Sequence, residues 1–378
     1  MPETTQHKNL TLGGAAANDP LDTPLLAGSH ANGTSAAKAM KSPISQLEPH
    51  AKPDTMNCDS PGGTSQRCET APGVSFLDGF KPKSIPEPAL DLVGQATKLK
   101  ENGLSGDLDT ICAQLSQTSY SHLKPYHALF FDEDGHFTKG STITDLVDAC
   151  NFDRRLQSCL MHYIGVIEIR LRCTISYHLA LERGVFAHID QNTFANTGRM
   201  SRMVHRYRRE RNRRIRRGDT SAKGYMARYG EFPIWAAVEA MSLGTLSMLF
   251  QNIASNTLKK EICKSFSVPP KVMQGWLRTL SFARNECAHF GNLYGKSLLK
   301  ESPRVEGYGP YDNRSLFHIC AIVQKLLGTG EAAHADSFPS HIEQEMKTFH
   351  IDPASLGFPE AWKEAMVATI HKGRRLAS

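Results

Sequence analysis

The sequence predicts an all-α fold built as a helical bundle, and three observations support this. Leucine and isoleucine recur every three or four residues throughout residues 153–182, the longest periodic segment of the chain. A second periodic stretch begins after Pro269-Pro270 and runs to His289. The alternation of apolar and polar residues that is typical of a strand is missing, and only residues 128–131 are compatible with a short extended segment.

Residues 1–85 are predicted to be a disordered tail. They are rich in serine, threonine, glycine, proline and alanine and contain few large apolar residues. Such a segment cannot bury enough apolar surface to offset the loss of chain entropy. The globular domain is therefore expected over residues 86–375, with a basic connecting segment at residues 198–225.

Capping residues and helix breakers divide the globular domain into successive helices. Asp and Thr side chains accept hydrogen bonds from the free N–H groups of a first turn, proline needs no such partner, and glycine favours helix ends. The predicted starts are Asp107, Thr142 or Thr144, residue 153, Pro233, Asn256 and Pro270. The predicted ends are Gly184, Asn252, Phe266 and Gly291. Two further helices are expected over residues 312–328 and 359–374, and Trp235 and Trp276 are expected in the core.

Composition argues against several classes of protein. No segment approaches the roughly 18 consecutive apolar residues of a transmembrane helix, and the first residues lack the pattern of a signal peptide. The nine cysteines include no C-x-x-C pair, which favours reduced thiols, and no His/Cys cluster has zinc spacing. We therefore expect a cytoplasmic protein without a metal or other cofactor.

The net charge of +6 is concentrated in one segment. Residues 202–217 contain nine arginines, opposed only by Glu210. Like charges at this density repel one another and predict an extended or loose segment. An RNA backbone is the natural counter-charge, and a solvated face is the alternative. The predicted RNA-binding residues are Arg206, Arg208, Arg209, Arg211, Arg213, Arg214, Arg216 and Arg217.

The end of the second periodic stretch is the most informative feature of the chain. Two neighbouring rows of side chains run along this predicted helix, and both begin with apolar residues. One row ends in Arg284, and the other ends in Asn285 and His289. Polar groups on an inward face cost about 1–3 kcal/mol each unless they are paired. They offer a fixed cation, a hydrogen-bonding amide and an imidazole that titrates at about pH 6.5. The alternative is an ordinary helix end, with His289 near the helix dipole and Arg284 in a salt bridge.

Arg284, Asn285 and His289 resemble the Arg-polar-x-x-x-His motif of HEPN-superfamily ribonucleases. Over roughly residues 90–366 the chain is similar to one branch of that superfamily, the Abi-like (abortive infection) proteins of bacteria. The resemblance rests on ordered blocks at residues 119–120, 123–126, 151–156, 167–172, 232–235, 242–244, 276–277 and 356–359, with Glu239 and Trp362. It implies a HEPN-like helical bundle.

The resemblance implies a metal-independent endoribonuclease. His289 would be the general acid or base, Arg284 the phosphate clamp, and Asn285 the group that orients the phosphate or the histidine. Attack by the ribose 2′-OH would leave a 2′,3′-cyclic phosphate. Glu168 and Arg172 would brace Arg284 or His289, although an i,i+4 pair that only stabilises the helix explains them equally well.

The implied biological setting is phage defence. Cleavage needs both an acid and a base while each chain has one motif histidine, so a homodimer with apposed motifs is expected. The expected partners are RNA, a second copy of the chain, and an antitoxin or inhibitory RNA or protein that restrains a growth-arresting toxin. The alternative function is a non-catalytic RNA-binding or protein-interaction module with the same fold.

Overall fold

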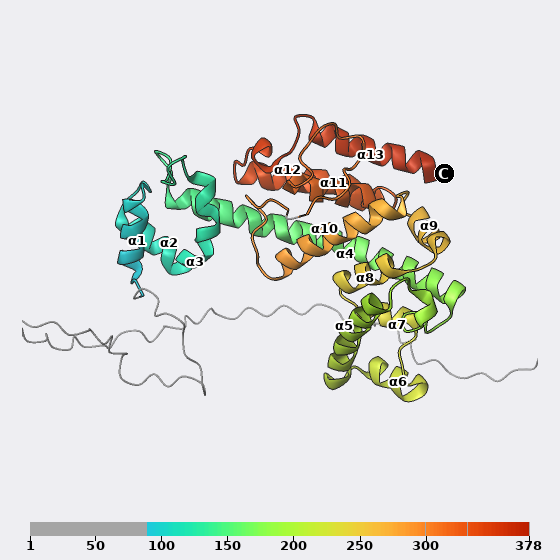
Figure 1. The fold of residues 1–378 in the computed structure, drawn as a ribbon. Helices are drawn as coiled ribbons and strands as arrows, with labels where there is room; N and C mark the ends of the chain where they lie inside the picture. The colour runs from blue at the N-terminus through green and yellow to red at the C-terminus, as the bar shows by residue number, and fades with distance from the viewer. Residues whose placement is uncertain (1–88, 299, 331, 378) are drawn as a thin grey trace, which may run out of the picture. The chain divides into compact units, whose positions relative to one another are not determined.

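The computed structural model of the protein describes residues 89–298, 300–330 and 332–377 (Figure 1). These residues form helices and connections, with isolated bridges but no β-strand among them, so the predicted all-α fold is confirmed. The predicted disordered tail, residues 1–85, lies outside the described residues.

The long helix α4 (Ile143–Arg183) is the element around which the others pack (Figure 1). Thr142 caps its first turn in a reciprocal arrangement with Asp145, and Gly184 ends it with φ of 88°. Both boundaries are as predicted. The two helices expected here, one from Thr142 and one from residue 153, are a single helix because its buried face runs on without interruption.

Short helices pack at the N-terminal end of α4. They are α1 (Leu92–Glu101), α2 (Leu108–Gln117), α3 (Tyr120–Leu123) and the 3₁₀ helix η1 (Lys124–Phe130). The Asp107 carboxylate accepts the backbone N–H of Thr110 at 2.8 Å, which confirms the predicted start of α2. The extended conformation considered for residues 128–131 is wrong for the first three of them, which continue the 3₁₀ helix.

Four helices gather toward the C-terminal end of α4 (Figure 1). They are α5 (Thr197–Arg216), α6 (Thr220–Tyr229), α7 (Ile234–Glu239) and α8 (Leu243–Asn252), preceded by the 3₁₀ helix η2 (Gln191–Thr193). The prediction of one helix from Pro233 to Asn252 is wrong. The Ser242 hydroxyl accepts the N–H of Thr245 and so starts a new helix after a break.

The regular helix α5 contradicts the prediction of an extended or loose arginine segment. Met200, Met203 and Tyr207 recur at helical spacing and are buried, and α5 packs against α8. The Tyr207 hydroxyl donates to Glu231 at 2.7 Å, and Arg211 pairs with the same carboxylate at 2.6 Å. Burial of the apolar row and this buried carboxylate outweigh the repulsion among the arginines.

The remaining helices cover another side of α4 and complete the core. They are α9 (Asn256–Lys264), α10 (Pro270–Ala288), α11 (Leu316–Leu327), α12 (Ala332–Thr348), η3 (Pro353–Leu356) and α13 (Trp362–Ala377). The starts of α9 and α10 agree with the prediction. The sequence does not predict α12, because Pro339 lies inside it.

The two tryptophans assigned to the core have different environments. Trp276 is buried on α10, as predicted. Trp235 is 48% exposed, so its assignment is wrong, because the short helix α7 turns Ile234, Ala237 and Val238 inward instead. Among the described residues no helix is long and apolar enough to cross a membrane.

Candidate functional site

The motif residues lie at the last turn of α10, and their orientation corrects the predicted inward face. Arg284 is half-buried, whereas Asn285 and His289 are exposed. The inward positions of this turn are taken by Ala283 and Cys287, which continue the buried row of the helix. A helix of 3.6 residues per turn drifts away from strict four-residue spacing, so a row that starts inward ends at the surface.

The helix ends at His289 itself. Phe290 takes the left-handed conformation, with φ of 53°, and the N–H of Gly291 donates to the Glu286 carbonyl at 2.8 Å. The prediction that Gly291 is the C-cap is therefore wrong, because His289 is the C-cap and Phe290 the left-handed residue. A Cβ at this position would displace the Glu286 carboxylate, which pairs with Lys296 at 2.6 Å.

The side chains of Asn285 and His289 form no hydrogen bond or ion pair with other residues that the structure describes. The backbone N–H of His289 donates to the Asn285 carbonyl at 3.0 Å, so only the main chain of the histidine is fixed. The imidazole is thus accessible to a ligand or to another protein chain.

Arg284 lines a polar cavity of about 700 Å³. The cavity also involves α4, α5 and the connection between α7 and α8. Six arginines line it, namely Arg172, Arg206, Arg209, Arg213, Arg214 and Arg284, together with His205 and the glutamates Glu210 and Glu239. The excess of cations makes this cavity a site of positive potential that favours an anion.

Ser242 and Thr245 bring the first turn of α8 to the same cavity. The N-terminus of a helix carries roughly half a positive charge and free N–H groups, so it adds to the attraction for anions. The sequence resemblance included residues 242–244 but assigned them no role. A serine directly before the first apolar residue of the helix, Ser242 before Leu243, is the signal that could have identified this helix start.

The pair Glu168 and Arg172 is partly buried and is more than a surface pair on one helix. Arg172 donates to the Glu168 carboxylate, to Glu239 at 3.1 Å and to the Met241 carbonyl at 2.9 Å. These contacts tie α4 to the connection between α7 and α8, which forms one wall of the basic cavity. Arg172 lines the cavity together with Arg284, but neither it nor Glu168 bonds to Arg284 or His289 in the described part of the chain.

The predicted RNA-binding arginines fall into two groups. Arg206, Arg209, Arg213 and Arg214 line the cavity, whereas Arg208, Arg211, Arg216 and Arg217 do not. Within the first group, Arg213 lies 3.5 Å from Glu210, and Arg214 donates to the Glu239 carbonyl. Arg206 and Arg209 have no ion pair among the described residues, so their charge is uncompensated by the protein.

Arg211 has a structural role instead. Its side chain is 11% exposed and donates to both oxygens of Glu231 at 2.6 Å. Burial alone would raise the pKa of Glu231, but hydrogen bonds from Arg211, the Phe232 N–H and Tyr207 outweigh it and hold the pKa below its usual range. Glu231 could not be identified from the sequence, because no local pattern relates it to α5.

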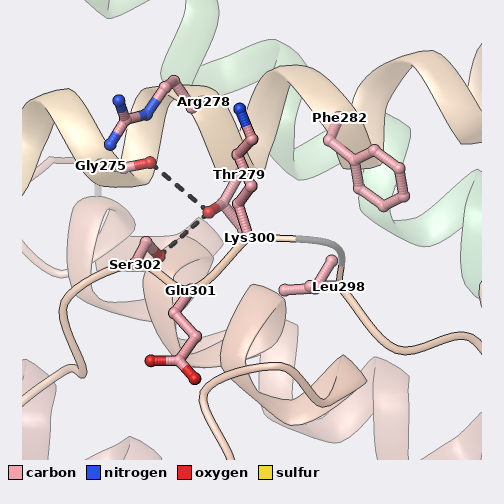
Figure 2. A pocket seen from close by; sticks show the side chains of 8 residues that line it. All are labelled: Gly275, Arg278, Thr279, Phe282, Leu298, Lys300, Glu301 and Ser302. Atoms are coloured by element: carbon pink, nitrogen blue, oxygen red, sulfur yellow. Dashed lines mark hydrogen bonds between the residues drawn. The ribbon is translucent and has the colours of Figure 1, made fainter.

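A second, smaller cavity of about 190 Å³ lies between α10 and the connection that follows it (Figure 2). By helix geometry its α10 residues, such as Thr279, lie on the side of the helix away from Arg284. Thr279 donates to Ser302 at 3.0 Å, and Ser302 contacts His318 Nε2 at 2.7 Å. Burial lowers the pKa of His318 to about 4, so the ring is neutral and acts as a buried hydrogen-bonding group. This network fastens the connection after α10 to the helix and is separate from the motif residues.

The described residues include no group of three or more His, Cys, Asp or Glu side chains placed to hold a metal ion. The sequence comparisons give one match. Residues 113–295 match the model of the family described as Abi-like protein, and this range contains every predicted site residue. No curated protein and no solved structure matches the chain.

Proposed function

Because the chain belongs to the Abi-like protein family over residues 113–295, we propose that it is a metal-independent endoribonuclease of abortive-infection defence. The observation that supports this most is the position of Arg284. It lies at the end of the motif helix, has no ion pair among the described residues, and shares a cavity with five other arginines. A phosphodiester backbone supplies the negative charge that balances the excess of arginines over glutamates in this cavity.

The motif residues divide the chemistry among them. The RNA 2′-OH attacks the adjacent phosphorus, and the bond to the 5′-oxygen breaks, which leaves a 2′,3′-cyclic phosphate. His289 takes or delivers the proton, because its imidazole is exposed, has no protein partner among the described residues and can act as a general acid or base. Arg284 stabilises the charge that develops on the phosphorus oxygens. Asn285, one residue along the helix, orients the phosphate.

The active unit is proposed to be a homodimer. One motif histidine per chain cannot act as acid and base at once, and two-fold pairing brings the same residue of both chains together. The exposed positions of Asn285 and His289 leave them free for such an arrangement. Sedimentation velocity at the concentrations of the cleavage assay is expected to show a dimer, and specific activity is expected to fall when dilution dissociates it. A fully active monomer would contradict the proposal.

The cavity-lining side of α5 is proposed to hold the RNA backbone. Arg206 and Arg209 are the test residues, because neither has a protein counter-ion in the described range. Replacing both by Gln is expected to reduce the slope of log K against log salt for single-stranded RNA by about 1.4, or about 0.7 for each lost contact. The matched control is Arg216→Gln with Arg217→Gln, which removes the same charge outside the cavity. An equal change in both double variants would show that only net charge matters.

The deciding experiment for the function is incubation of the purified protein with total RNA in EDTA. Cleavage that leaves 2′,3′-cyclic phosphate ends supports the ribonuclease. The protein would act in the cytoplasm as a toxin, with an antitoxin or inhibitory RNA or protein as its restraint. A non-catalytic RNA-binding module is the second candidate, because Asn285 and His289 do not line the cavity that contains Arg284. RNA binding without cleavage would favour it.

A further inference from the structure

Two side chains of α4 hold the segment that directly follows His289. Asp153 is fully buried, and its carboxylate accepts the backbone N–H of Leu293 at 2.9 Å and that of Tyr294 at 3.2 Å. One turn further along α4, the Gln157 amide donates to the Gly291 carbonyl. Residues 291–294, which follow α10, are therefore anchored by three hydrogen bonds to α4, a helix that lies far from them in the sequence.

The buried carboxylate is unusual for a residue that only closes a turn. Burying a charge is costly unless it is paired or hydrogen-bonded, and no lysine, arginine or histidine within the described residues pairs with Asp153. The two backbone N–H groups and the Tyr126 hydroxyl, at 2.9 Å, are its partners. Burial raises the pKa of Asp153, and these donors oppose that shift.

His289 depends on this anchoring. Its imidazole has no hydrogen-bond partner in the described structure, and the next residue, Phe290, is 72% exposed and in a left-handed conformation that non-glycine residues rarely adopt. The contacts to Gly291, Leu293 and Tyr294 add to the backbone hydrogen bonds of the last turn and restrict the backbone from which the imidazole extends. Because no side chain that the structure describes holds the imidazole, its position depends on the backbone of His289 and of the residues that follow it.

We propose that Asp153 and Gln157 are positioning residues that fix the backbone of His289 through residues 291–294, and with it the position from which the imidazole extends. The catalytic part of this inference rests on the proposed ribonuclease function. A misplacement on the order of 1 Å can reduce a rate about 100-fold without any loss of a reacting group.

The test compares Asp153→Asn and Gln157→Met with Tyr163→Phe. The first two variants keep the side-chain size but remove a backbone acceptor or a backbone donor. Tyr163→Phe is the matched control, because it removes one hydrogen bond from α4 to His341, at 2.7 Å, without touching residues 291–294. In Asp153→Asn and Gln157→Met the rate at saturating RNA is expected to fall about 10- to 100-fold with little change in KM, and the control is expected to match the parent.

A second readout does not depend on activity. The imidazole NMR signal of His289, identified by its loss in His289→Ala, is expected to shift in Asp153→Asn and Gln157→Met but not in Tyr163→Phe. Amide exchange at Leu293 and Tyr294 should accelerate in the same two variants. If the folded Gln157→Met protein keeps the parental His289 signal and rate, the inference is overturned. A parent protein that does not cleave RNA would refute the ribonuclease, while the NMR signal would still decide whether the two residues position His289.

Discussion

Replacing His289 by alanine is expected to lower the rate of RNA cleavage in EDTA by about 10²–10⁴-fold, the usual loss on removing a general acid or base. The side chain is exposed and makes no hydrogen bond or ion pair in the described structure, so its removal should leave folding unchanged. In a dimer with apposed motifs the variant loses both the acid and the base. The measurement is the single-turnover rate at saturating RNA, with the melting temperature recorded alongside.

His136→Ala is the control for this prediction, because His136 is also an exposed histidine but lies in the turn before α4, away from the motif. It is expected to cleave RNA at the parental rate. Cleavage by His289→Ala at the parental rate would show that the ribonuclease activity, if present, comes from another site. A loss of equal size in both variants would indicate a contaminating nuclease that varies between preparations.

Replacing Glu231 by glutamine is expected to destabilise the protein by about 3–5 kcal/mol, the usual cost of removing one partner of a buried ion pair. Arg211 would stay buried without a counter-ion, since both of its contacts at 2.6 Å are to the Glu231 carboxylate. α5 would then lose the attachment that overcomes the repulsion among its arginines. Urea unfolding measures the loss. Glu210→Gln is the control, because its pair with Arg213 is exposed, and a change within about 0.5 kcal/mol is expected there.

The stability difference between the parent and Glu231→Gln should also depend on pH. The pKa of Glu231 in the folded protein lies below its usual value of 4.5. A carboxyl group with a lowered pKa contributes its stability above the unfolded pKa and loses it as the pH falls through the folded pKa. The difference is therefore expected to be constant near neutral pH and to shrink below about pH 4.5. A difference that stays constant into acid would show that the charge of Glu231 is not what holds α5.

The candidate site shows where prediction from sequence ends. The helix that contains Arg284 and His289 could be placed from Pro269-Pro270 and its apolar row, and the structure begins it at Pro270. The direction of the motif side chains could not, because Asn285 and His289 point outward once Ala283 and Cys287 take the buried positions. Which positions of a helix are buried depends on the neighbouring helices. The spacing of apolar residues within one helix carries no information about where those neighbours lie.

By itself the sequence determined the helical architecture and several boundaries of the helices. Asp107, Thr142 and Gly184 act on their own first or last turn, within four residues, so their effect can be read locally. Only the tertiary structure decided that the arginine segment is a helix and that part of it shares a cavity with Arg284. Those outcomes depend on contacts between residues 20 or more positions apart, such as Arg211 with Glu231, which the local sequence pattern does not contain.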